Sequence, residues 1–170
     1  ENCATNKMKI LKDIVSGDEL ASDAYPCEEE DDCVFKITTK LITKAADGYQ
    51  YDEPDAQTDV SSDAVTVNNL VDAHRLVETT FTKKSYMVYI KGYLQALRAH
   101  LREHNPERTK AFMKAAQVFV GKVSKDFRDY QFFTGESMNP DGMVVLMKYS
   151  EDGQTPYVYI FKDGVEEVKY

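Results

Sequence analysis

Residues 82–128 combine the apolar spacing of two amphipathic helices with a high density of positive charge. The segment holds 11 of the 21 Lys and Arg residues and only three acids, which gives it a net charge of +8. The residues before it, 1–81, carry −11, and residues 129–170 carry −5. A strongly basic segment within an acidic chain is typical of a module that binds acidic partners. It favours that class over an enzyme that acts on a small substrate.

The first half of this basic segment has the pattern of a helix that starts after Thr82. Threonine is a favourable N-cap residue, because its side chain accepts a hydrogen bond from the first helical turn. Apolar side chains then recur with a helical period at Tyr86, Ile90, Tyr93, Leu94, Leu97 and Leu101. The opposite side carries Lys84, Lys91, Gln95, Arg98 and Arg102.

The tripeptide Asn105-Pro106-Glu107 ends this helix and begins another. It supplies a capping residue, a proline for the first turn and an acid at the positive end of the helix dipole. We expect the second helix to bury Phe112, Ala116, Phe119, Val123 and Phe127. We expect it to expose Lys110, Lys114, Gln117 and Lys125. Because the connection is short, the helices are predicted to be antiparallel neighbours whose basic stripes can form one face.

The flanking chain is rich in β-forming residues. Strands are predicted at 9–15, 33–38, 39–43, 65–71, 130–133, 143–149, 156–161 and 165–169. Residues 18–23 are expected to form one helical turn, and the five acids at 28–32 a solvated loop. Residues 47–63 hold many acids and little to bury, so they are predicted to form a long mobile loop.

Composition indicates one domain over residues 8–170, with 11 Tyr and 8 Phe to fill its core. Residues 1–7 have no pattern, and we interpret them as a leader or a remnant of expression. No apolar run approaches the length of a membrane span, and the first ten residues lack the apolar stretch of a signal peptide. We therefore expect a cytosolic protein.

The three cysteines, Cys3, Cys27 and Cys33, are too few for a disulfide framework, and the last two are expected to be free thiols beside a strand.

No motif for catalysis is present. The serines lie in no nucleophile elbow, no phosphate-binding glycine loop exists, and no calcium loop of the EF-hand type is formed. His100 and His104 have a spacing that can bind metal, but a third ligand is missing, so we interpret them as exposed residues at a helix end. We predict no catalytic residues.

The acidic segment is interpreted as a spacer, with weak calcium attraction as the alternative. The basic helices either bind an acidic protein or nucleic acid, or only solubilise the chain.

The carboxyl-terminal third resembles a known family. Residues 127–145, FRDYQFFTGESMNPDGMVV, resemble the second signature of the translationally controlled tumour protein family. Further similar stretches are IVSGDELASD at 14–23, FTKKSY at 81–86, YIKGY at 89–93, NPER at 105–108, DGQTPY at 152–157 and FKDG at 161–164. The similarity runs from Met8 to Tyr170. It departs from the family at 52–63, where the first signature is not found, and at the end, where the terminal cysteine of some members is missing.

The resemblance implies an α+β fold. It would have a twisted, mainly antiparallel β core of the β-tent type, like that of the Mss4 family of small-GTPase chaperones. A projecting antiparallel helical hairpin at 82–128 and a long flexible acidic loop at 47–63 would complete it. The resemblance also implies a cytoplasmic, non-enzymatic protein with several partners, linked to protein synthesis, growth and survival. Tubulin and microtubules, a small GTPase, and translation or survival factors are the expected partners, whereas nucleic acid and a membrane are not expected.

The resemblance also implies where ligands bind. Calcium is the expected cofactor, bound weakly at an unknown site, and microtubule stabilisation is the expected activity. The tubulin contact falls on the hairpin, where we assign it to Lys84, Lys91, Arg98, Arg102, Lys110, Lys114 and Lys125. The alternative function is nucleotide exchange on a Rheb-type GTPase, or chaperoning of its nucleotide-free form, and the acid that would face the GTPase is Glu19.

Overall fold

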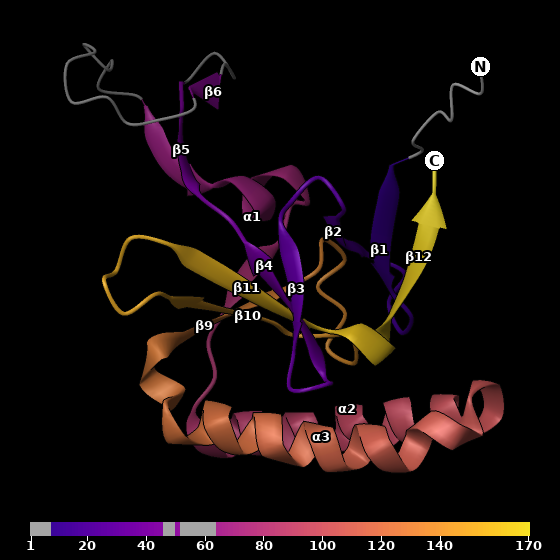
Figure 1. Ribbon diagram of the computed structural model, residues 1–170. Coiled ribbons are helices and arrows are strands. Elements are labelled where there is room, and N and C mark those ends of the chain that lie inside the picture. The colour runs from indigo at the N-terminus through magenta and orange to yellow at the C-terminus, as the bar shows by residue number, and fades with distance from the viewer. Residues whose placement is uncertain (1–7, 46–49, 52–63) are drawn as a thin grey trace.

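The computed structural model describes residues 8–45, 50–51 and 64–170. Three antiparallel sheets and a pair of long helices make up this part of the chain (Figure 1). One sheet has the order β12-β1-β2, from β12 (Val165–Lys169), β1 (Lys9–Asp13) and β2 (Glu19–Ser22). Lys9 lies opposite Lys169, so the first and last strands of the fold pair along their length.

The largest sheet has six strands in the order β3-β4-β11-β10-β9-β8. They are β3 (Cys27–Glu30), β4 (Val34–Thr38), β8 (Val77–Thr79), β9 (Tyr130–Thr134), β10 (Val145–Tyr149) and β11 (Pro156–Phe161). The third sheet joins β6 (Gln50–Tyr51), β5 (Leu41–Lys44) and β7 (Val65–Asn68). The short helix α1 (Asn69–Ala73) follows β7 directly, because Asn68 caps it by accepting from the backbone of residues 70 and 71.

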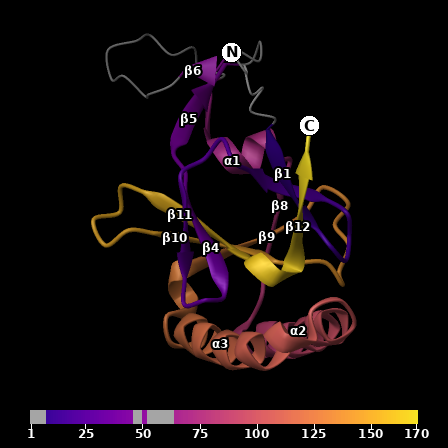
Figure 2. The same cartoon turned by 45° about the vertical axis from the view of Figure 1, so that its right-hand side comes forward.

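The two long helices lie side by side along one side of the β core (Figures 1 and 2). They are α2 (Lys83–His104) and α3 (Pro106–Lys125). Thr82 caps α2 in a reciprocal box with Ser85, and Asn105 is the single residue between the helices. All six apolar residues predicted to be buried on α2 are buried. Rings from both helices meet the large sheet, as in Tyr86 against Phe132 and Phe119 against Tyr159.

The α+β fold, the paired helices and the mainly antiparallel core are thus as predicted. One boundary is wrong, because α3 ends at Lys125 and Phe127 is half-buried in a short 3₁₀ turn, Phe127–Asp129. The likeness to the Mss4 family stays a prediction.

Two predictions in the first part of the chain are wrong. Residues 18–23 do not form a helical turn, since Glu19–Ser22 is the strand β2, which pairs with β1 and buries Leu20 and Ala21 completely. The acids at 28–32 are not a solvated loop. Cys27–Glu30 pairs with β4 as an edge strand, and Asp31 and Asp32 form the turn between them in the left-handed backbone region.

Four further strands differ from their predicted form, the first being the strand predicted at 9–15, which ends at Asp13. Residues 39–43 do contain a strand, β5, but it pairs with β6 and β7 in the third sheet and not with β4. The strand predicted at 65–71 stops at Asn68, where α1 begins. The strand predicted from Met143 begins at Val145.

The acidic segment 47–63 is described only at Gln50–Tyr51, which pairs with β5 as β6. The rest of the predicted mobile loop and residues 1–7 lie outside the described residues.

Candidate interaction surfaces

The seven cations assigned to the hairpin surface are distributed over both helices. Lys84, Lys91, Arg98 and Arg102 come from α2, and Lys110, Lys114 and Lys125 from α3. Six of them are exposed, and Arg98 is half-buried. Within residues 8–45, 50–51 and 64–170, none of the seven forms an ion pair. Their charge is therefore available to a partner.

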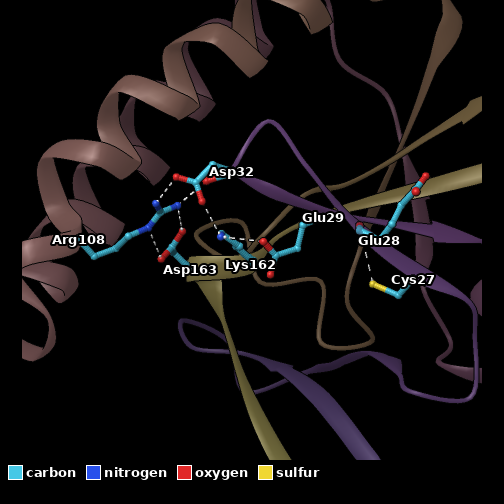
Figure 3. A network of polar contacts seen from close by, with 7 residues as sticks. All are labelled: Cys27, Glu28, Glu29, Asp32, Arg108, Lys162 and Asp163. Atoms are coloured by element: carbon cyan, nitrogen blue, oxygen red, sulfur yellow. Dashed lines mark hydrogen bonds and ion pairs between the residues drawn. The ribbon is translucent and has the colours of Figure 1, made fainter.

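Two other hairpin cations, Arg108 and Lys122, form ion pairs within the molecule. Arg108 contacts the turn between β3 and β4 through its Nη1, 2.6 Å from Asp32 Oδ2, and its Nη2 also donates to the backbone carbonyl of Asp32 (Figure 3). The same guanidinium donates to Asp163 at 3.2 Å and 3.0 Å. Lys122 Nζ lies 2.7 Å from Asp31 Oδ2. These contacts tie α3 to the core, and no local signal in the sequence predicts them.

Lys162 extends this network to the edge strand β3. Its ammonium lies 2.8 Å from Asp32 Oδ1 and 3.2 Å from Glu29 Oε2 (Figure 3). The hydrogen bonds from Lys162 and then from Arg108 lower the pKa of Asp32 to about 2. The hydrogen bonds that Lys162 donates to Asp32 and to Glu29 raise the pKa of Lys162, with Asp32 as the larger cause. Asp31 and Asp32 thus form ion pairs within the molecule, Asp31 with Lys122 and Asp32 with Arg108 and Lys162. They do not form an unpaired acidic surface.

Glu19 lies in a different place. It is exposed at the start of β2 and lines a surface hollow of about 440 Å³. The other lining residues are Lys12, Gly17, Asp18, Ala73, His74, Arg75 and Glu136. None of them comes from the hairpin, so the hollow beside Glu19 is separate from the seven hairpin cations assigned to tubulin binding. Burial lowers the pKa of His74, so its imidazole is neutral at pH 7.

The loop between β9 and β10 contributes Glu136 to the lining of this hollow and contacts two neighbouring segments. Ser137 Oγ donates to Asp18 at 2.6 Å, and Arg75 pairs with Glu136 at 3.1 Å. A Cβ at Gly135 would collide with the Asp18 side chain, which explains the glycine at this position. These contacts place the side chains of Asp18, Arg75 and Glu136 in the lining of the hollow beside Glu19.

The loop is also anchored from within the core. Buried Asp13 accepts from the backbone N–H of Met143 at 2.7 Å. Tyr89 of α2 donates to the carbonyl of Gly142 at 2.6 Å and accepts from the N–H of Val144 at 2.8 Å. Hydrogen bonds with Asp13 and Tyr89 therefore hold the end of this loop, at residues 142–144, against the core.

No metal centre is evident in the described part of the chain. The rings of His100 and His104 stack with their centroids 4.1 Å apart, and His104 Nδ1 lies 3.0 Å from the carbonyl of His100. In the described residues, no group of three or more His, Cys, Asp or Glu side chains is placed to hold a metal ion. Cys27 is exposed on β3, whereas Cys33 is buried just before β4, and both are free thiols as predicted.

Comparison with known proteins gives the family of the chain. The family model described as "Translationally controlled tumour protein" matches residues 8–166. The chain belongs to the translationally controlled tumour protein family. A homologue of that name from Schizosaccharomyces pombe is 49% identical over 168 residues, covering 96% of this chain and 100% of the relative. One from Saccharomyces cerevisiae is 46% identical over 166 residues, covering 95% and 99%.

Solved structures of the translationally controlled tumour protein family share the fold. The S. pombe protein p23fyp superposes with a TM-score of 0.82 at 48% identity, covering 95% of this chain and 99% of that one. The Caenorhabditis elegans member superposes with a TM-score of 0.73 at 25% identity, covering 95% and 98%. The family resemblance expected from the signature at 127–145 is confirmed. Among the described residues of the structure, no helix is long and apolar enough to cross a membrane.

Proposed function

We propose that this protein is a non-enzymatic cytosolic interaction protein whose hairpin binds and stabilises microtubules. The observation that carries the proposal is the set of seven hairpin cations, from Lys84 to Lys125, that no described acid neutralises. The hairpin has a net charge of +8, and the acidic surface of tubulin is the foremost partner for it.

The architecture of the hairpin supports this role. Phe112, Ala116 and Val123 are completely buried, so α3 presents its outer side from a fixed position on the core. Arg108 and Lys122 hold the same helix to the β3–β4 turn. A partner that binds the outer cations therefore meets helices that are already formed, and little backbone entropy is lost on binding.

Charge reversal on α3 tests the proposal. The triple variant Lys110→Glu, Lys114→Glu and Lys125→Glu should lose co-sedimentation with microtubules at low salt and keep its helical circular dichroism. A single reversal, Lys110→Glu, should weaken binding, whereas Lys169→Glu on β12 makes the same charge change away from the hairpin and should leave binding intact. Retained binding by the folded triple variant would refute the proposal.

A second function, the regulation of a Rheb-type small GTPase, is favoured by the setting of Glu19. This carboxylate is exposed beside a polar hollow that Asp18 also lines, and Asp18 accepts a hydrogen bond from Ser137. Nucleotide exchange requires a surface that binds the nucleotide-free GTPase better than the loaded form, and no catalytic group is needed. Glu19→Val should slow exchange, while Asp23→Val, an exposed acid just after β2, should not. Equal exchange by both variants would remove Glu19 from the site.

Calcium binding and contacts with translation or survival factors are part of the proposal. Isothermal titration with millimolar calcium tests the first directly, since a weak carboxylate site gives measurable heat at that concentration. Absence of heat at any calcium concentration up to that level would remove the calcium site.

A further inference from the structure

A groove lies at the base of the hairpin, where β8 leads into α2 and α3 leads into β9. It consists of two surface hollows of about 310 Å³ and 520 Å³ that share Phe127 and Arg128 in their linings. Glu78 and Thr79 of β8 also line the first hollow, and Lys83 at the start of α2 lines the second. We refer to the two hollows together as the hairpin-base groove.

The strand on one side of the groove has an unpaired edge. β8 is the last strand of the six-stranded sheet, and on its outer side it pairs with no other strand of the described residues. Such an edge presents backbone N–H and C=O groups that can pair with an added strand. Because Glu78 and Thr79 also line the first hollow, a strand added there would lie beside it.

The floor of the first hollow is aromatic. The half-buried rings of Phe81 and Phe127 flank the buried ring of Phe132, with centroid separations of 5.4 Å and 5.2 Å. An apolar side chain that entered this hollow would contact ring faces and edges already held in place by the core. The hollow therefore favours a bulky aliphatic or aromatic residue of a partner.

The second hollow carries excess positive charge. Lys83, Lys125 and Arg128 line it, all are exposed, and none forms an ion pair within the described chain. The acids on its rim are Asp126, which Lys148 neutralises at 3.4 Å, and Asp129.

The backbone of α2 adds to this positive potential. The first turn of this 22-residue helix contains no acid, whereas the first turn of α3 contains Glu107. The free N–H groups and dipole of α2 thus add to the three cations at the hollow. A carboxylate is the complementary ligand.

We propose that the hairpin-base groove binds an extended acidic peptide by strand addition to β8. A bulky apolar side chain of the peptide occupies the hollow over Phe81, Phe127 and Phe132. The carboxylates that follow it lie against Lys83, Lys125 and Arg128 at the start of α2. With the apolar residue in the first hollow and the acids at the second, the acids of the peptide lie away from Glu78, which lines the first hollow. The site uses an unpaired sheet edge and an aromatic hollow, so it is distinct from the outer basic face and shares only Lys125 with it.

A designed peptide tests the site on the full chain. The chain contains no tryptophan, so a blocked octapeptide Thr-Val-Trp-Val-Glu-Glu-Ser-Glu reports its own burial by fluorescence. We expect a blue shift of the tryptophan emission that saturates on titration with the protein. A control peptide with lysines in place of the three glutamates should show no shift. Absence of a shift for the acidic peptide at millimolar protein would overturn the proposal.

Nuclear magnetic resonance locates the contact. Amide signals of residues 77–81 and 124–132 should move on addition of the peptide, and outward-facing amides of β8 should exchange more slowly with solvent, because an added strand protects them. Shifts confined to the outer sides of α2 and α3, without protection of β8, would mean that the peptide binds only the basic face, and the proposal would be wrong.

A matched pair of variants completes the test. Arg128→Glu should weaken peptide binding about tenfold, since it replaces an attractive charge with a repulsive one. Lys169→Glu makes the same charge change on β12 and should bind as the unchanged protein does. Equal affinity of the two variants for the peptide would contradict binding in the hairpin-base groove. Arg128 is not among the seven cations of the outer face, so Arg128→Glu should keep microtubule binding if the two sites are separate.

Discussion

Arg108 of α3 and Asp163 are joined by a two-pronged ion pair, with Nε 3.2 Å from Oδ1 and Nη2 3.0 Å from Oδ2. The Arg108 side chain is 16% exposed and that of Asp163 is 12% exposed, so the pair is largely shielded from water. It links the start of the second hairpin helix to the short turn Lys162–Gly164 between the last two strands. The hairpin is thus held to the core by charge as well as by its apolar face.

Arg108→Ala should lower the free energy of unfolding by roughly 3 kcal/mol, because it leaves the shielded carboxylate of Asp163 without its partner. Urea unfolding followed by circular dichroism measures the change. Arg102→Ala removes an exposed, unpaired arginine from the same hairpin and should change stability by less than about 0.5 kcal/mol. In the double variant Arg108→Ala and Asp163→Ala, the loss should be smaller than the sum of the single losses. Additive losses would mean that the pair does not couple.

The low pKa of Asp32 predicts a loss of stability in acid. Its folded pKa of about 2 lies below the ordinary value of 3.8, so its stabilising contribution is complete above pH 4 and is lost as pH falls toward 2. Asp32→Asn removes this titration. The unfolding free energy of the variant should therefore fall less steeply between pH 4 and pH 2 than that of the unchanged protein. Parallel curves would show that the contacts from Lys162 and Arg108 do not stabilise the ionised form.

Gly164 is required by the buried hydroxyl of Tyr93. A Cβ at residue 164 would collide with the Tyr93 hydroxyl and lie 2.6 Å from Met143 Cε. Gly164→Ala should therefore lose about 1–3 kcal/mol of stability through overpacking. Tyr93→Phe removes the hydroxyl, which has no hydrogen-bond partner within the described residues, so it should recover part of that loss in the double variant.

Gly92→Ala is the control for this glycine, because nothing lies within 4 Å of the position that a Cβ would take on the exposed side of α2. It should raise stability by about 0.5–1 kcal/mol through helix propensity. Thermal unfolding ranks all four variants, and a Gly164→Ala variant as stable as Gly92→Ala would contradict the packing described for Tyr93.

The two described cysteines should differ in reactivity. Cys33 is 0% exposed, and burial raises the pKa of its thiol to about 12, so almost no thiolate is present at pH 8. Cys27 is exposed to reagent, although partial burial and the neighbouring acids raise the pKa of its thiol. In a Cys3→Ser background, iodoacetamide at pH 8 should modify Cys27 and leave Cys33 intact until the protein unfolds. Mass spectrometry of peptides reads the outcome, and equal labelling in the native state would refute the burial of Cys33.

Local sequence signals predicted the hairpin well. Thr82 caps α2 through its own side chain, and the buried stripe of α2 follows directly from its period. Pro106 lies in the first turn of α3 as predicted, but the Asn105 side chain forms no capping hydrogen bond. The strand β2 was missed because its four residues are extended only by pairing with β1, and the Asp18-Glu19 start resembles a helix cap. Local propensity could not supply that pairing.

The charge network was missed for a similar reason. Asp32 and Arg108 are 76 residues apart in the chain, and neither residue type carries a signal for its partner. A run of five acids at 28–32 suggested a solvated loop, and only the fold shows that the turn after β3 faces α3. Charge density along the sequence predicted which segment is basic. It could not predict which cations, such as Arg108 and Lys122, are neutralised internally.

The most direct test of the proposed function is the salt dependence of microtubule co-sedimentation. Binding through unpaired surface cations should fall steeply between low and physiological ionic strength, because the screening length shortens to about 8 Å at 0.15 M. The unchanged protein should show this fall, and the variant with Lys110, Lys114 and Lys125 reversed to glutamate should not bind at any salt concentration. Binding that is independent of salt, or no binding of the unchanged protein at low salt, would contradict the account.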